Sequence, residues 1–135
     1  MPDPEQFSLL TVKGLAQKTP DRLTCLVLDQ AIFTQIKGHL EKMISEDRIW
    51  HLIAVGDRSS DIEDELDDLI VSSTPHLVMT SSVESYDFDE IFSLATMMPE
   101  GSEQPRKIAY VYDDAQPELR EIAERFAREA TALPG

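Results

Sequence analysis

Short apolar runs alternate with helical patterns four times along this chain, and no other feature constrains its fold as strongly. The apolar runs occupy residues 23–28, 50–55, 76–80 and 108–112. The helical patterns, with apolar residues every three or four positions, occupy residues 29–46, 60–71, 87–98 and 117–131. The runs do not alternate strictly between polar and apolar residues, which is typical of strands covered on both faces. The alternation therefore predicts a parallel sheet between two layers of helices.

The fold class that we expect is α/β, a three-layer sandwich. Its sheet is four-stranded and mostly parallel, with helices on both faces and a flavodoxin-like strand order of 2-1-3-4. Residues 23–135 form a single α/β domain, and a chain of 135 residues buries roughly two-thirds of its extended-chain surface without disulfides or metals. Residues 1–22 are either an N-terminal arm or an extra strand.

Acidic residues are concentrated in one third of the chain. The whole sequence has 26 Asp and Glu residues, 12 Lys and Arg residues and a formal net charge of −14. Residues 57–103 contain 13 of the acids and a single base, Arg58, whereas the other 88 residues contain 13 acids and 11 bases. This excess argues against direct binding to nucleic acid or to an anionic membrane, because both require clustered Lys and Arg.

The predicted helix over residues 60–71 carries acids on nearly all of its polar surface. Ser60 and Glu63 form a predicted capping box at its start. Like charges stand four residues apart three times, in the pairs Asp61–Glu65, Glu63–Asp67 and Asp64–Asp68. Each such pair destabilises an isolated helix by roughly 0.2–0.5 kcal/mol. The last predicted helix differs, because Glu121 and Arg125 form a pair of opposite charge at the same spacing.

Catalytic and metal-ligating patterns are not found. The first predicted strand lacks the glycine-rich turn of a nucleotide site, and no Gly-x-Ser-x-Gly elbow is present. His39, His51 and His76 do not have the spacing of metal ligands. The lone Cys25 lies in an apolar run, where a thiol packs as an inert side chain, and it fits a reducing cytoplasm. We therefore expect no enzymatic activity, no cofactor and no metal site.

Polar residues at the strand ends support a second interpretation. Asp29, Asp57, Thr80 and Asp113 stand at the ends of the four predicted strands, and open parallel sheets bind ligands at the carboxyl ends of their strands. A small regulatory or ligand-binding domain would use these residues. A phospho-receiver domain fits poorly, because that family requires a lysine after its final strand and Lys107 precedes the fourth strand here. The acids also serve as ordinary helix N-caps.

The acidic segment predicts a binding protein that neutralises a basic protein partner. A basic surface offsets the repulsion between the acids and speeds the encounter, and the most concrete form is an immunity protein that inhibits a bacterial toxin. We expect a cytoplasmic location, because the apolar runs are too short for a membrane span and the N-terminus does not resemble a signal peptide. A merely solubilising surface is the alternative, and no pattern indicates an oligomeric state. The predicted partner-binding residues are Asp61, Asp64, Glu65, Asp67, Asp68, Glu84, Tyr86, Asp87, Asp89 and Glu90.

One ordered set of features carries a family resemblance. A strand with a flanking aromatic residue, Trp50–Asp57, is followed by the acid-rich segment Asp61–Asp68, by Met79-Thr80-Ser81 and by Asp89-Glu90-Ile91-Phe92. In this order, residues 50–98 resemble an uncharacterised bacterial α/β family, a domain of unknown function. That family continues with Trp-His where this chain has Ser82-Val83. The resemblance implies an α/β fold and no established activity.

Overall fold

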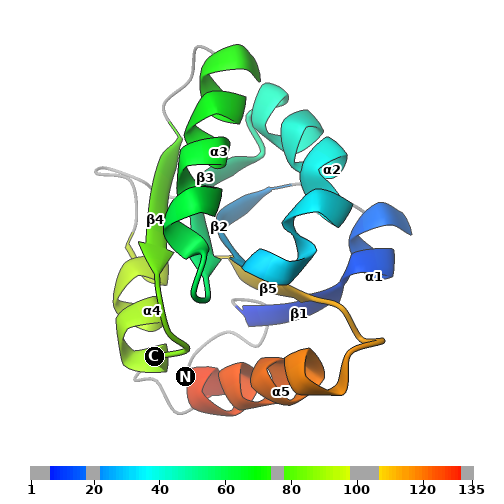
Figure 1. Cartoon of the computed structure of the whole chain (residues 1–135), viewed down its shortest axis with the longest axis vertical. Helices are drawn as coiled ribbons and strands as arrows, with labels where there is room; N and C mark the ends of the chain where they lie inside the picture. Colours follow the sequence, from blue (N-terminus) through cyan, green and yellow to red (C-terminus); the bar gives the residue numbers. More distant parts are fainter. Residues whose placement is uncertain (1–6, 18–21, 74–77, 98–106, 132–135) are drawn as a thin grey trace.

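The computed structural model describes residues 7–17, 22–73, 78–97 and 107–131, in which strands and helices alternate (Figure 1). The strands are β1 (Phe7–Thr11), β2 (Leu23–Asp29), β3 (Ile49–Val55), β4 (Met79–Val83) and β5 (Ile108–Tyr112). The helices are α1 (Val12–Gln17), α2 (Phe33–Ser45), α3 (Ser59–Ser73), α4 (Phe88–Ala95) and α5 (Pro117–Thr131), and a 3-10 turn, η1 (Gln30–Ile32), precedes α2. The predicted α/β class is confirmed.

The sheet has five strands, all parallel, in the order β1-β5-β2-β3-β4. The expected four strands and the order 2-1-3-4 are both wrong. Phe7–Thr11 pairs with β5 as an additional strand, and β5 lies beside β2 instead of beyond β4. Strand order depends on which face each connecting helix takes, because right-handed crossovers on opposite faces carry the chain in opposite directions. An apolar helical stripe is the same on either face, so the sequence pattern does not contain this information.

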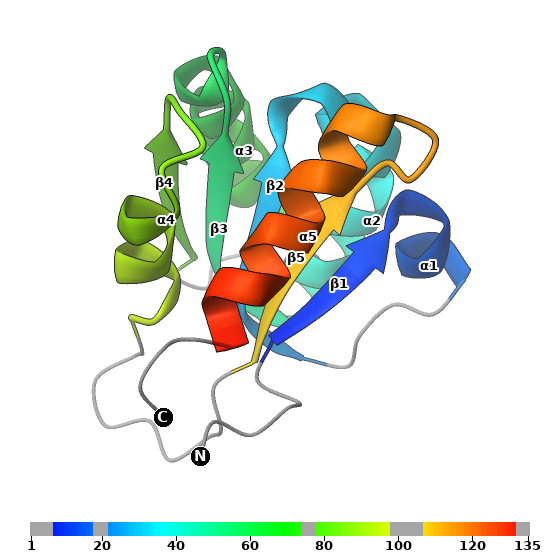
Figure 2. The same ribbon diagram turned by 90° about the horizontal axis from the view of Figure 1, so that it is seen from below.

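Helices cover both faces of the sheet. The helices α1, α2 and α3 lie on one face, and α4 and α5 lie on the other (Figure 2). Side chains of a strand alternate between the faces, so Leu26 and Leu28 of β2 contact the first group of helices while Cys25 and Val27 contact the second. Burial raises the pKa of the Cys25 thiol far above its ordinary value, which makes the thiol unreactive.

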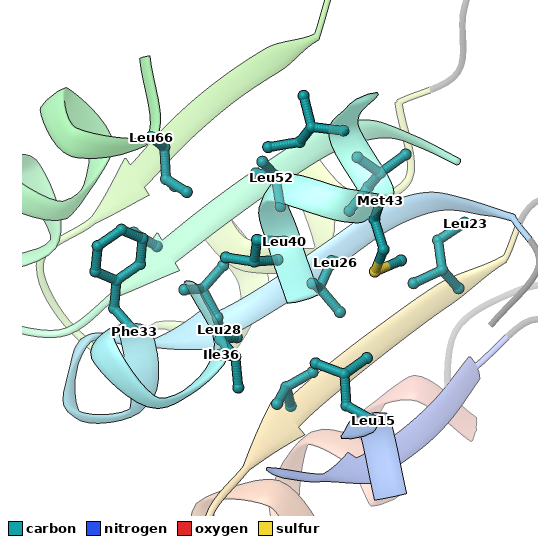
Figure 3. Packing of buried hydrophobic residues seen from close by; sticks show 14 of the residues in the cluster. Leu15, Leu23, Leu26, Leu28, Phe33, Ile36, Leu40, Met43, Leu52 and Leu66 are labelled. Atoms are coloured by element: carbon teal, nitrogen blue, oxygen red, sulfur yellow. The ribbon is translucent and has the colours of Figure 1, made fainter. Parts of the chain in front are cut away.

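The two cores differ in composition. On the first face, Leu26 and Leu28 pack beneath Ile36, Leu40 and Met43 of α2, and all five side chains are fully buried (Figure 3). Aliphatic residues of α3 extend this core toward β4. The second core is aromatic: the ring of Phe126 lies 4.8 Å from that of Phe92 and 4.9 Å from that of Tyr110. Both cores contain side chains of β2 and β3, which lie in the interior of the sheet.

The third predicted strand is shifted along the chain. Its first residues, 76 and 77, lie outside the described residues, and β4 extends from Met79 to Val83. The run Thr80-Ser81-Ser82 is polar, so an apolar criterion places the end of this strand too early. These side chains are only partly buried, because β4 lies at the edge of the sheet. An edge strand tolerates hydroxyl groups that find hydrogen-bond partners.

The turn after β3 requires a glycine. Gly56 has a φ of 121°, and a Cβ atom at this position would lie 2.8 Å from Cδ of Gln30. The side-chain oxygen of Gln30 accepts a hydrogen bond from the backbone N–H of Arg58. This contact joins the residue that follows β2 to the residue that precedes α3.

Candidate functional site

Two acidic side chains of α3 hold the helix against β4. The hydroxyl of Thr80 donates to Oδ1 of Asp67 at 2.6 Å, and the hydroxyl of Ser82 donates to Oε1 of Glu63 at 3.0 Å. Alternate residues of β4 point toward α3, so both hydroxyls reach the same helix. The predicted capping box of Ser60 and Glu63 is wrong, because α3 already begins at Ser59 and Glu63 binds the strand instead.

The other acids of α3 surround its outward side. Asp61 keeps 69% of its side chain exposed while it lies 3.7 Å from the guanidinium of Arg58. Glu65 and Asp68 line a hollow of about 220 Å³ between α2 and α3, together with Lys37 of α2. Asp64, which stands between Asp61 and Glu65 in the sequence, is also exposed. Basic side chains therefore border the acidic helix at its start and along α2, but α3 itself contains none.

A second group of acids follows β4. Glu84, Asp87, Asp89 and Glu90 are all exposed, and Oδ1 of Asp87 caps α4 by accepting from the backbone N–H of Glu90 at 3.4 Å. Because α3 and α4 cover opposite faces, the acids of α3 and those of α4 lie on either side of β4 (Figure 2). We call both groups together the acidic surface; its members are Asp61, Glu63, Asp64, Glu65, Asp67, Asp68, Glu84, Asp87, Asp89 and Glu90.

The aromatic residues near the acidic surface point inward. Phe88 is 4% exposed and belongs to the aromatic core, where the guanidinium of Arg125 lies 4.9 Å from its ring centre. Tyr86 is half-buried, and its hydroxyl donates to Oδ2 of Asp29. The segment from Glu84 to Asp89 therefore presents mainly carboxylates to solvent, with only a part of the Tyr86 ring among them.

A buried histidine supports β4 from the other side. Nε2 of His51 lies 2.8 Å from the hydroxyl of Ser81, and the His51 side chain is fully buried beneath α4. Burial lowers the pKa of His51 below its ordinary value, while the backbone of Leu94 acts in the opposite sense. Sequence analysis did not find this pair, because it depends on the register that sets Ile53 of β3 opposite Ser81. The three consecutive hydroxyls of β4 are thus all held by side chains of neighbouring elements.

A second polar cluster, which we call the strand-end cluster, contains Asp29 at the carboxyl end of β2, Tyr86, and Tyr110 in the middle of β5. Asp29 is 1% exposed, and its carboxylate accepts hydrogen bonds from the backbone N–H of Ala31 at 2.8 Å and from Tyr86. Tyr110 of β5 is fully buried on the same face, and its hydroxyl has no hydrogen-bond partner among the described residues. After β2 the chain enters α2 on one face, and after β5 it enters α5 on the other. Open α/β sheets bind ligands between two neighbouring strands whose following helices lie on opposite faces, as they do here.

The other strand-end residues are not part of this cluster. Asp57 is exposed. Asp113 accepts from the backbone N–H of Ala115 at 2.9 Å, and this hydrogen bond lowers the pKa of Asp113. Thr80 does not stand at a strand end, because β4 continues to Val83, so its placement there by sequence is wrong. No sequence signal pointed to Tyr110, which is one of several apolar positions in β5.

No protein-family model, curated protein or solved structure matches this chain. Within the described residues, His, Cys, Asp and Glu side chains do not gather in any group of three that could hold a metal ion. None of the helices in the described part of the chain is long and apolar enough to cross a membrane. Function must therefore be inferred from the geometry of the acidic surface and of the strand-end cluster.

Exposed like charges on α3 lower the stability of the fold. Asp64→Ala removes the repulsion with Asp68 and introduces a better helix former, so the free energy of unfolding should rise by about 0.5–1 kcal/mol. Glu124→Ala on α5 is the matched control, because Glu124 is also exposed but has Arg120 and Arg128 at helical spacing. Urea unfolding of both variants at low salt measures the difference. A loss of stability in Asp64→Ala would contradict this account of the helix.

The buried hydroxyl of Tyr110 makes the fold sensitive to alkaline pH. Burial, and then the negative charge of Asp29, raise the pKa of Tyr110 above its ordinary value. The unfolded chain loses this proton near pH 10, while the folded protein retains it. The free energy of unfolding is therefore unaffected by this group below about pH 10 and falls as the pH rises further. Tyr110→Phe should therefore gain about 1.4 kcal/mol over the wild type between pH 8 and pH 11.

Urea unfolding at pH 8 and pH 11 measures this relative gain for Tyr110→Phe. The comparison at pH 8 serves as the internal control, because it contains the packing effect of losing the hydroxyl and none of its ionisation. If the two proteins lose stability in parallel up to pH 11, the raised pKa is wrong.

Proposed function

We propose that this protein binds a basic protein partner through the acidic surface, and that its concrete role is that of an immunity protein which inhibits a bacterial toxin. One observation carries the proposal: α3, β4 and α4 contain eight acids and no Lys, Arg or His. The packing of the sheet brings these three adjacent elements together. Glu63 and Asp67 bind hydroxyls of β4. The other six carboxylates are exposed, and two of them, Glu65 and Asp68, line the hollow beside α2.

The repulsion within the acidic surface supports a role in binding. Asp64 and Asp68 remain like-charged neighbours on an exposed helix, although α5 shows that this chain also places opposite charges at that spacing. Lys and Arg side chains of a partner would remove the repulsion, and the negative field would accelerate association. The proposed function is binding without catalysis or a cofactor, in the cytoplasm, and without direct contact to nucleic acid or membrane.

Charge reversal on α3 tests this function. Replacement of Asp61, Asp64, Glu65 and Asp68 by Lys should abolish binding to the toxic product of an adjacent reading frame and should abolish rescue of growth. The matched control replaces Glu118, Glu121, Glu124 and Glu129 by Lys, because these residues are exposed on α5 and the net charge changes equally. The wild-type complex should weaken about tenfold or more between 50 and 300 mM salt, since charge–charge attraction is screened.

Growth rescue, affinity and circular dichroism of each variant are the measurements for the charge-reversal test. Loss of binding in the α3 variant alone, with its fold intact, supports the proposal. Equal rescue by both variants, or an adjacent product without toxicity, would contradict the immunity role.

The strand-end cluster supports a second candidate, a small ligand-binding domain. The observation that favours it is the unpartnered Tyr110 hydroxyl near the buried carboxylate of Asp29, at the reversal between β2 and β5. A ligand with an amino group would suit the carboxylate and the hydroxyl together. Thermal unfolding with a panel of small amines and divalent metal ions tests this candidate.

A ligand of this cluster should stabilise the wild type by about 2.7 kcal/mol at a hundred times its Kd. The same ligand should have no effect on Asp29→Asn and should still stabilise Asp113→Asn, which alters a partly exposed carboxylate at the same edge. If no compound of the panel raises the melting temperature, this second candidate fails.

A further inference from the structure

The outer side of β4 offers unpaired backbone groups. The N–H of Gly56 donates to the carbonyl of Val83 at 3.0 Å, so the backbone of Val83 faces β3. Successive residues of a strand point their backbone groups to opposite sides. The N–H and C=O groups of Thr80 and Ser82 therefore point away from the sheet, and no described strand pairs with them.

The edge of β4 lacks the usual devices that prevent strand pairing. Natural edge strands are protected by Lys, Pro, inward charges or bulges. The strand Met79–Val83 has no charged residue and no proline, and its pairing with β3 runs without interruption. What surrounds this edge is negative charge on both faces, from the acids of α3 on one and from Asp89 and Glu90 of α4 on the other. A second copy of this chain would bring the same acids to the edge and be repelled, whereas a basic strand would be attracted.

The edge is also ordered before any partner arrives. The hydroxyls of Thr80 and Ser82 are bound to α3, and that of Ser81 lies beside His51. These three contacts hold the strand from both faces. They also direct the hydroxyls away from the outer backbone groups. An ordered edge lowers the entropy cost of adding a strand.

We propose that the basic partner adds an extended strand to the outer edge of β4, pairing with the backbone of Thr80 and Ser82. This inference rests on the proposed function and specifies how the acidic surface is used. Side chains of an added strand alternate between the two faces of the sheet. Lys or Arg on one face would meet the carboxylates of α3, and on the other face those that follow β4. The partner segment is therefore an extended strand with basic residues on both faces.

Two peptides of equal charge test strand addition directly. The probe is a fluorescent nine-residue peptide of Lys and Val with lysines on both faces, and its control has the same sequence with alternate backbone nitrogens methylated. Methylation removes the donors that pair with an edge but keeps every charge. Fluorescence anisotropy at low salt should show about tenfold weaker binding of the methylated peptide, which corresponds to the loss of one or two backbone hydrogen bonds.

A matched pair of variants isolates the backbone donor on the protein. Both Ser82→Pro and Ser82→Ala lose the hydroxyl that binds Glu63, but only Ser82→Pro also loses the outward N–H. Proline is tolerated at such an edge position. Ser82→Pro should bind the unmethylated peptide about tenfold more weakly than Ser82→Ala. Should Ser82→Pro not fold, amide exchange in the wild type decides: the N–H groups of Thr80 and Ser82 should exchange at least about tenfold more slowly with peptide bound.

The outcomes separate this inference from the proposed function. If both peptides bind equally and the Lys variant of α3 binds neither, strand addition is overturned while the acidic surface keeps its role. If the Lys variant binds both peptides as the wild type does, the proposed function itself fails. Unchanged exchange of the Thr80 and Ser82 amides with peptide bound would also overturn strand addition. A preference for the unmethylated peptide, lost in Ser82→Pro and in the Lys variant, supports both.

Discussion

Burial of the central strands on both faces is the constraint on which the rest of this structure depends. All seven residues of β2 are buried, and their side chains alternate between an aliphatic core under α2 and an aromatic core under α5. Helices must therefore cover both faces, and the chain has to reverse its direction across the sheet once. The reversal occurs after β4, which leaves β4 at one edge and returns β5 to the interior. The acidic surface and the strand-end cluster both follow from this path.

The acids of α3 divide into two roles that follow from the rotation of the helix. Glu63 and Asp67 lie one turn apart, face β4 and bind its hydroxyls. Asp64 lies on the outward side, where no contact within the fold explains a negative charge. The first pair stabilises the contact between helix and strand. Asp64 repels Asp68 one turn away, which lowers the stability of the helix, and both carboxylates are exposed to a partner, which is why the proposed function relies on them.

The sequence predicted local features well and spatial relations poorly. The apolar stripe of α5, which includes Ala123 and Phe126, was sufficient to place that helix, because a period of 3.6 residues is a local property. The polar edge strand β4 was shifted, because its hydroxyls depend on partners from α3 and β3. Tyr86 was predicted as a partner-binding residue, and its hydrogen bond to Asp29, 57 residues away in the chain, could not be seen in the sequence. The concentration of acids could be read directly from the sequence, because charge is a property of composition, whereas their role in binding stays a prediction.

The sequence by itself determined the α/β class, the approximate position of most helices and strands, and the local concentration of negative charge. Each of these depends on residues that are close together in the chain. Only the tertiary structure decided the strand order, the edge position of β4, the hydrogen bonds of its hydroxyls and the meeting of Asp29 with Tyr86. These depend on the face that each helix covers. That choice is made by the packing of the whole sheet, and an apolar stripe packs equally well on either side.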